Sequence, residues 1–280
     1  MDIEPLASDQ LPPRYAVESD EEEDEINPLT KQVDQSDVST NVKVVGDAIP
    51  ESKPLIIASG SVATLWAKGA DLGEQVGAIA VNGVQVGLVF TPSWTTAVVI
   101  VSEVMTRLPY SMMHPYAETI ISKLKPTNVS LLDQYPAPVY ISSAQLPLHQ
   151  AQIRYITTQA STAYPDIVHS FDPPNLISTT SAAFMAILNM PASQVPATLF
   201  LLPGSQILPP PPRTLEPSDF DWIQDHEAEW SAALMDQAHV LLNQAVGVKT
   251  PAKWAIKGES GVAARSAQSK PKIGEGSMYI

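Results

Sequence analysis

The chain has 280 residues, an apolar content of 44% and a net charge of −14 at pH 7, so it can bury a sizeable core. It contains no cysteine, which excludes disulfides, thiol catalysis and cysteine-based zinc sites. The charge is uneven, with −11 on residues 1–51, −7 on 52–248 and +4 on 249–280. This balance argues against nucleic acid as the main partner, because phosphate binding needs clustered Lys and Arg.

Residues 1–52 are predicted to form an acidic, largely disordered extension. They contain the run ESDEEEDE at 18–25, several prolines and little apolar periodicity. No basic segment is followed by an apolar stretch, so we expect no signal peptide. The longest apolar runs fall far short of a membrane span. We therefore expect a protein of the cytoplasm, with the nucleus as a second compartment, that does not act in a membrane.

The folded body is predicted to span residues 53–248 and to begin with strands. The stretch KPLIIASG at 53–60 is an apolar run that ends in turn residues, as in a buried strand. In VGAIAVNGVQVGLVF at 76–90, Asn82-Gly83 separates two alternating runs. This pattern predicts a hairpin, because a two-residue type I′ turn needs positive φ at both positions. A further strand is expected at 95–103.

Helical and strand patterns alternate in the rest of the body. Apolar residues near helical spacing predict a helix from about Pro115 that Pro126 closes. The stretch PATLFLLPG at 196–204 has a continuous apolar run, which is typical of a strand covered on both faces. The other predicted elements are strands at 127–133 and 137–143, a helix at 175–190 and a stiff polyproline loop at 209–212.

The last element of the body is predicted to be a long helix over residues 218–248. Ser218 is the expected N-cap, acidic residues follow it in the first turn, and Gly247 stands near the end. Strands thus alternate with helices after an initial hairpin. This order predicts one α/β domain with a mixed sheet flanked by helices.

Few residues point to chemistry. No nucleophile elbow, phosphate loop, dinucleotide fingerprint or zinc-protease motif is present. DHEAEW at 225–230 has Trp230 where a second metal-binding His would stand, so a solvated polar helix face is the better interpretation. SGSVATL at 59–65 has the small residues of a phosphate loop, but such stretches are common in α/β turns. We expect no catalytic residue, no cofactor and no metal site.

Residues 249–280 are predicted to form a flexible basic tail with a docking motif at its end. The sequence finishes GEGSMYI, so three residues that favour burial, Met278, Tyr279 and Ile280, follow a polar tether. One hypothesis is a ligand for a PDZ domain, because an apolar–x–apolar end can add a strand to a sheet edge with its carboxylate captured. The other is the hydrophobic–Tyr–any ending that docks between proteasome α subunits, where carboxylate pairing and aromatic burial supply the affinity.

Together these features resemble the proteasome assembly chaperone family, and its first member in particular. The resemblance rests on an α/β body of this length, the LFLLPG strand with a Pro-rich loop after it, a long closing helix and the apolar–Tyr–Ile end. It implies a nucleoside-phosphorylase-like sandwich without known catalysis. It also implies a heterodimer with proteasome assembly chaperone 2 on the outer face of the 20S α ring, where the pair promotes ring assembly and blocks premature docking of regulatory particles.

Carried onto this sequence, the resemblance makes Met278, Tyr279 and Ile280 the residues that dock in a pocket between α subunits, with the free carboxylate of Ile280 essential. Two other classes of function stay open at this point. One is an α/β enzyme of phosphorylase-like ancestry whose site is not evident from the sequence. The other is an adaptor protein whose C-terminus binds a PDZ domain.

Overall fold

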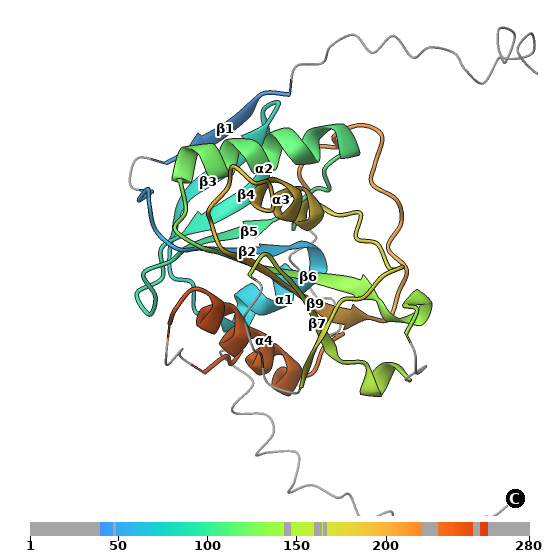
Figure 1. Cartoon of the computed structure of the whole chain (residues 1–280). Helices are drawn as coiled ribbons and strands as arrows, with labels where there is room; N and C mark the ends of the chain where they lie inside the picture. The colour runs from blue at the N-terminus through green and yellow to red at the C-terminus, as the bar shows by residue number, and fades with distance from the viewer. Residues whose placement is uncertain are drawn as a thin grey trace, which may run out of the picture. The chain divides into compact units, whose positions relative to one another are not determined.

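A mixed sheet of nine strands forms the centre of the chain (Figure 1). The computed structural model describes residues 40–46, 49–142, 147–159, 164, 167–219, 229–248 and 253–256, all within the compact unit Thr40–Ile280. The strands are β1 (Val42–Val45), β2 (Leu55–Ser59), β3 (Gln75–Val81), β4 (Val84–Phe90), β5 (Val98–Ser102), β6 (Val129–Pro136), β7 (Ile153–Thr157), β8 (Val168–Ser170) and β9 (Ala197–Gly204). The helices are α1 (Gly60–Gly69), α2 (Tyr110–Leu124), α3 (Thr180–Leu188) and α4 (Ala232–Ala245), with short 3-10 turns η4 (Ala137–Val139) and η5 (Leu148–Gln150).

The strand order is β1-β3-β4-β5-β2-β6-β9-β7-β8. The central strands β5, β2, β6 and β9 are parallel to one another, whereas β1, β3 and β4 form an antiparallel ribbon at one side. Strand β4 joins this ribbon to β5, and β7 pairs antiparallel with β9 at the other side. Every residue of β2, β5 and β9 is buried, as expected for strands with both faces covered.

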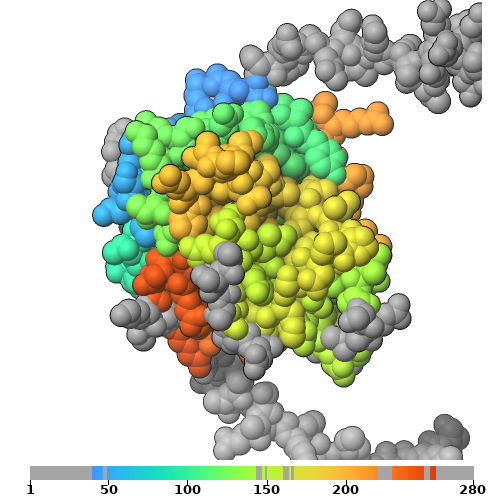
Figure 2. Space-filling model, in the orientation of Figure 1, coloured from blue at the N-terminus to red at the C-terminus, as the bar shows by residue number. Residues whose placement is uncertain are grey.

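Helices cover both faces of the sheet. Helices α2 and α3 lie on one face and α1 and α4 on the other (Figure 1). Figure 2 shows α2 and α3 side by side, and Tyr116 of α2 meets Phe184 of α3 edge to face at 6.2 Å between ring centroids. The opposite core gathers Trp66 of α1, Phe200 of β9 and Leu242 of α4. The predicted fold class, a single α/β domain with a mixed sheet flanked by helices, is therefore confirmed.

The predicted hairpin is present as β3 and β4. Its turn residues Asn82 and Gly83 have φ values of +49° and +85°, as a type I′ turn requires. The Asn82 side chain also accepts a hydrogen bond of 2.8 Å from the Asn41 N–H. This bond ties the turn to the start of β1, which pairs with β3.

Three differences from the predicted elements have local causes. The sheet begins before residue 53, because β1 adds Val42–Val45 to the edge of β3. Residues 60–69 form α1, a helix that was not predicted, although their apolar residues repeat at helical spacing toward the core. The strand predicted at 137–143 is wrong, because Pro136 and Pro138 remove N–H donors and the chain turns through η4.

The two long helices also begin elsewhere than predicted. Helix α2 starts at Tyr110 and keeps Pro115 inside it. The closing helix is shorter than predicted, because α4 starts at Ala232 with the Ser231 hydroxyl accepting a hydrogen bond from the Leu234 N–H. The expected cap Ser218 instead donates to the Gln85 carbonyl at 2.8 Å. Residues 220–228 lie outside the described residues. In the part of the chain that is described, no helix is long and apolar enough to cross a membrane.

Candidate functional site

The predicted docking residues Met278, Tyr279 and Ile280 lie outside the described residues, and so does the segment that leads to them from residue 257. The structure does describe the root of this tail, which we define as residues 253–256. The root lies against α1 and α4, after the closing helix has ended. Its contacts establish where the tail leaves the folded body.

Trp254 fixes the tail root. Its side chain is 4% exposed, and its indole N–H donates to the Trp66 carbonyl at 2.8 Å. Its backbone N–H donates to an Asp236 carboxylate oxygen at 3.0 Å. The next N–H, that of Ala255, donates to the Gly69 carbonyl at 3.1 Å. A Cβ at Gly69 would overlap the indole ring, so glycine is required there for Trp254 to pack.

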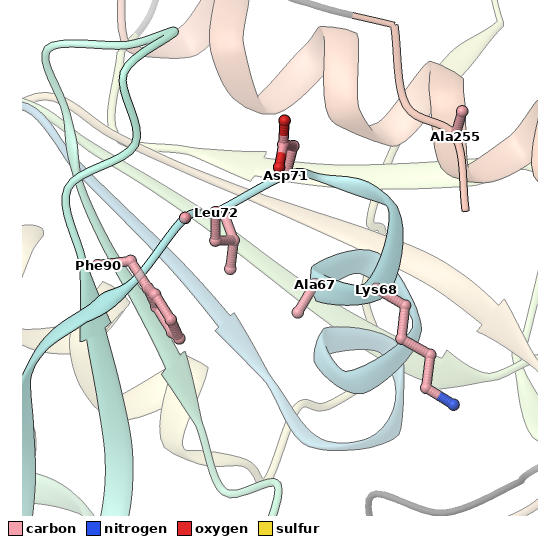
Figure 3. A pocket seen from close by; sticks show the side chains of 7 residues that line it. Ala67, Lys68, Asp71, Leu72, Phe90 and Ala255 are labelled. Carbon is pink, nitrogen blue, oxygen red and sulfur yellow. The ribbon is translucent and has the colours of Figure 1, made fainter. Parts of the chain in front are cut away.

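A shallow hollow of about 310 Å³ lies beside the tail root (Figure 3). Ala67, Leu72 and Phe90 form its apolar wall, and Ala255 lies at its edge. Figure 3 shows the Lys68 side chain extending away from the other labelled residues. Asp71 also lines the hollow, but its side chain and that of Lys68 point in different directions (Figure 3), so the charged groups do not converge as in a catalytic or small-molecule site.

The histidine of α4 is a packed core residue. His239 is 1% exposed, its Nδ1 accepts a hydrogen bond of 3.2 Å from the Trp66 indole N–H, and Trp94 meets its ring edge to face. His226, which belongs to the DHEAEW stretch, lies outside the described residues. Among the residues that are described, no group of three His, Cys, Asp or Glu side chains is arranged to hold a metal ion.

A second cavity, of about 80 Å³, lies at the carboxyl ends of the parallel strands. We call it the acidic cavity, and its polar wall is formed by Ser59, Gly60, Ser61, Glu103, Arg107, Asp133, Gln134, Ser178 and Thr179. Met113, Leu208 and Pro211 form its apolar side. Strand β2 is followed by α1 on one face, and β5 leads into α2 on the other. Open α/β sheets form crevices at such positions, because the chain leaves neighbouring strands in opposite directions.

Asp133 is held in this cavity by the N-terminus of α3. One of its carboxylate oxygens accepts a hydrogen bond of 2.6 Å from the Thr179 hydroxyl, and the other accepts one of 2.8 Å from the Gln134 N–H. Thr179 is the N-cap residue of α3, whose positive end favours a carboxylate. Burial outweighs these contacts and raises the pKa of Asp133 above its ordinary value.

Glu103 follows β5 directly and is also buried. It adopts a φ of +55°, which is uncommon for a residue with a side chain, and its carboxylate accepts a hydrogen bond of 2.8 Å from the Leu108 N–H. Burial raises the pKa of Glu103 to about 7, and the nearby charge of Asp133 adds to this effect. Arg107 reaches the cavity wall, but its guanidinium donates to the carbonyls of Pro209 and Pro210.

Sequence reasoning did not select Glu103 or Asp133. The available signal was a single acidic residue at the end of each otherwise apolar strand, in VVIVSE and VSLLD. The weak phosphate-loop stretch at 59–65 does reach the same place, since Ser59, Gly60 and Ser61 line the cavity. It supplies one part of a wall whose carboxyl groups come from two other strands.

No family model and no curated protein sequence matches this chain. Solved structures with a similar fold include Pyrococcus furiosus PbaA, an archaeal homologue of proteasome-assembly chaperone, at 8% identity and a TM-score of 0.47 over 81% of this chain and 93% of that one. Pyrococcus furiosus PbaB, an archaeal proteasome activator, matches at 8% identity and a TM-score of 0.47 over 82% of this chain and 96% of that one. A protein of unknown function from Thermoplasma acidophilum matches at 12% identity and a TM-score of 0.46 over 78% and 85%.

The structural neighbours of this chain thus include an archaeal homologue of the proteasome assembly chaperones and an archaeal proteasome activator. At these identities and TM-scores the likeness does not transfer a function or a partner to this chain. The function must therefore be argued from the residues of the chain itself.

Proposed function

We propose that this protein is a proteasome assembly chaperone of the cytoplasm and nucleus. It acts as a heterodimer with proteasome assembly chaperone 2 on the outer face of the 20S α ring, promotes assembly of that ring and blocks premature docking of regulatory particles. Its C-terminal residues Met278, Tyr279 and Ile280 dock in a pocket between α subunits. The observation that carries the proposal is this hydrophobic–Tyr–Ile end on a tail whose root is fixed to a folded body.

The sequence features behind the resemblance correspond to real elements of the fold. The LFLLPG stretch lies in β9, a fully buried strand at the centre of the sheet. The Pro-rich segment after it is held by Arg107, which donates to the Pro209 carbonyl at 2.7 Å. Helix α4 then covers one face and leads to the tail root. The body therefore offers a rigid platform from which the tail extends.

The fixed root gives the proposed tether a defined length. From Ile256, the last described residue, 24 residues lead to Ile280. A flexible chain of this length spans roughly 25–30 Å root-mean-square, which corresponds to an effective concentration in the millimolar range. A weak interaction of the tail is then sufficient once the body is on the ring. The net charge of +4 on residues 249–280 also favours an acidic surface.

The three docking residues have complementary roles in this proposal. The terminal carboxylate of Ile280 pairs with a basic residue of the pocket in a charge-assisted hydrogen bond. The Tyr279 ring supplies a large rigid contact area, and its hydroxyl finds a polar partner. Met278 is desolvated beside the ring and gains hydrophobic free energy.

An exposed apolar cluster supports the existence of a protein partner. Leu176 is 89% exposed and Ile141 is 62% exposed, and the Asn175 side chain links their segments by bonding the N–H and carbonyl of Ile141. Val139 is half exposed two residues away. Clusters of this kind on a folded surface often mark protein contacts.

We expect Leu176→Asp to reduce copurification of proteasome assembly chaperone 2 if the cluster lies in the heterodimer interface. The same change at exposed Met190 serves as the control.

The docking role is tested by capture of α-ring intermediates. The chain and proteasome assembly chaperone 2 are coexpressed, and α subunits that copurify are quantified by mass spectrometry. We expect Tyr279→Ala to lower capture by about tenfold or more, since a central aromatic anchor carries a large share of binding energy. One residue appended after Ile280 should have a similar effect, because it moves the carboxylate.

Tyr110→Ala is the matched control, because Tyr110 is an exposed tyrosine of α2 at 58% exposure. It should leave capture unchanged, and circular dichroism should show every variant folded. Absence of α subunits from the wild-type complex would contradict the chaperone role itself. Unchanged capture by Tyr279→Ala, combined with binding of the wild-type tail to a PDZ domain, would support the adaptor hypothesis.

A further inference from the structure

The acidic cavity contains polar groups that the proposed docking role does not use. Its wall joins the N-terminus of α1 to two carboxyl groups on neighbouring strands. Ser59 stands at the N-cap of α1 but makes no capping bond. Its hydroxyl oxygen is buried in a residue 4% exposed and has no hydrogen-bond partner. A buried hydroxyl without a partner is costly, so this atom indicates a missing ligand.

The charges around the cavity define what class of ligand fits. An anion would be opposed by Glu103 and Asp133, which both line the wall. A cation would be opposed by the Arg107 guanidinium and by the positive ends of α1 and α3. An anion and a cation would therefore each lie close to groups of their own charge. A neutral ligand avoids both repulsions. The ligand must still be polar, because it faces carboxylate acceptors and hydroxyl groups.

We propose that the acidic cavity binds a small neutral polyol or the edge of a sugar through two adjacent hydroxyl groups. Each ligand hydroxyl can donate to a carboxylate of Glu103 or Asp133 and also accept from the Ser59 hydroxyl. The carboxylate oxygens are already oriented, since Leu108, Thr179 and Gln134 donate to them. Ligand atoms on the other side contact the apolar wall of Met113, Leu208 and Pro211.

The size of the cavity agrees with this class of ligand. A space of about 80 Å³ exceeds what one water requires, roughly 10–15 Å³, and accommodates a group of several atoms. It is too small to enclose a nucleotide or a peptide. The ligand therefore enters with a diol group and leaves the rest of its structure outside. This inference does not rest on the proposed docking role, which depends on residues 278–280.

The test titrates the full chain with erythritol by calorimetry and by saturation-transfer NMR, at about pH 8.5, where Glu103 with its pKa of about 7 is mostly ionised. Butanediol with only its two terminal hydroxyls is the matched ligand, because it lacks the adjacent hydroxyl pair. Ethylammonium and inorganic phosphate represent the cationic and anionic classes. We expect erythritol to bind and the other three probes to bind at least about tenfold more weakly, as expected when hydrogen bonds to charged groups are lost.

Variants locate the binding. Glu103→Gln and Ser59→Ala should each weaken erythritol binding by about tenfold, whereas Glu118→Gln, an exposed carboxylate of α2, should not change it. If a variant fails to fold, the comparison of the four probes on the wild-type protein still decides the proposal. Absence of erythritol binding overturns it, as does equal binding of butanediol or stronger binding of ethylammonium or phosphate. Retained binding by both folded cavity variants would place the ligand elsewhere and overturns it too.

Discussion

Glu103 and Asp133 show that a carboxyl group can be well packed although its ionised form is unfavourable at that place. Both carboxyl groups are buried at the carboxyl ends of parallel strands, and the ion pairs of the described chain do not include either. Hydrogen bonds from Leu108, Thr179 and Gln134 satisfy their oxygens but do not neutralise a charge. The raised pKa values follow, because burial penalises the ionised form more than these donors stabilise it.

This cost predicts a particular pH dependence of stability. The pKa of Glu103 is about 7 in the folded chain against an ordinary value of 4.5. Between these values the unfolded chain releases the proton and the folded chain keeps it, so the contribution of Glu103 to stability is largest below pH 4.5 and falls as pH rises toward 7. Glu103→Gln removes this loss and should make the protein more stable than wild type near neutral pH, by on the order of 3 kcal/mol.

Urea midpoints measured across this pH range check the prediction. The difference between Glu103→Gln and wild type reports on Glu103 together with its coupling to Asp133, whose charge raises the pKa of Glu103. Glu118→Gln is the control, since it removes an exposed carboxylate from the same domain. A difference that stays constant from pH 4.5 to 7 would show that Glu103 does not keep its proton in the folded chain.

At the scale of elements, local patterns were sufficient where a turn or a run of apolar residues decided the structure. Asn82-Gly83 fixed the hairpin because a type I′ turn has few alternatives, and the apolar run of β9 required two covered faces. The closing helix was predicted too long because helical spacing continues before Ser231. Hydrogen bonds to residues distant in sequence hold Trp230 and Ser218 outside the helix. Trp230 donates to the Pro203 carbonyl, and Ser218 donates to the Gln85 carbonyl.

The candidate sites differ in how much the sequence could reveal. The docking motif is local, so three consecutive residues predict it. The acidic cavity is assembled from β2, β5, β6 and the start of α3, and no single stretch of sequence contains its two carboxyl groups. The tail root is equally non-local, because Trp254 contacts Trp66, Gly69 and Asp236. No local pattern in the sequence indicates where Trp254 packs.

The contact of the tail root with α1 yields a prediction for Gly69. A Cβ at this position overlaps the Trp254 indole, so Gly69→Ala should displace the ring and destabilise the domain by about 1–3 kcal/mol. Trypsin should then cleave more readily at Lys253, the residue next to Trp254. Lys68→Ala on the same helix turn serves as the control, because Lys68 is exposed and extends outward (Figure 3).

The Gly69→Ala effect has an internal test. If the overlap is its cause, Trp254→Ala should cost less free energy in the Gly69→Ala background than in the wild type. Equal costs in both backgrounds would mean that the two residues act independently. The overlap would then not be the cause of the loss. Helix propensity could not explain the loss either, because Ala favours a helix more than Gly does.

For the whole molecule, the proposal divides the work between a rigid body and a tethered end. The described part of the body begins next to β1 and ends at the tail root, and both are fixed by contacts to other elements. The proposed docking residues end 24 residues after the root, so a flexible tether would make their local concentration depend on tether length rather than on new contacts. Body and tail can therefore be varied separately, which makes the coupling between them measurable.

Doubling the tether measures that coupling. A Gly/Ser spacer of the same length as residues 257–280, inserted after Ile256, should lower the effective concentration by about threefold, because it falls roughly as the −3/2 power of length. Capture of α-ring intermediates should fall by no more than this, far less than the loss from Tyr279→Ala. A spacer as damaging as Tyr279→Ala would indicate that residues 257–277 make specific contacts. A spacer that leaves capture unchanged, together with an inactive Tyr279→Ala variant, would mean that the tail binds tightly by itself. Its binding would then not depend on the local concentration that the body provides.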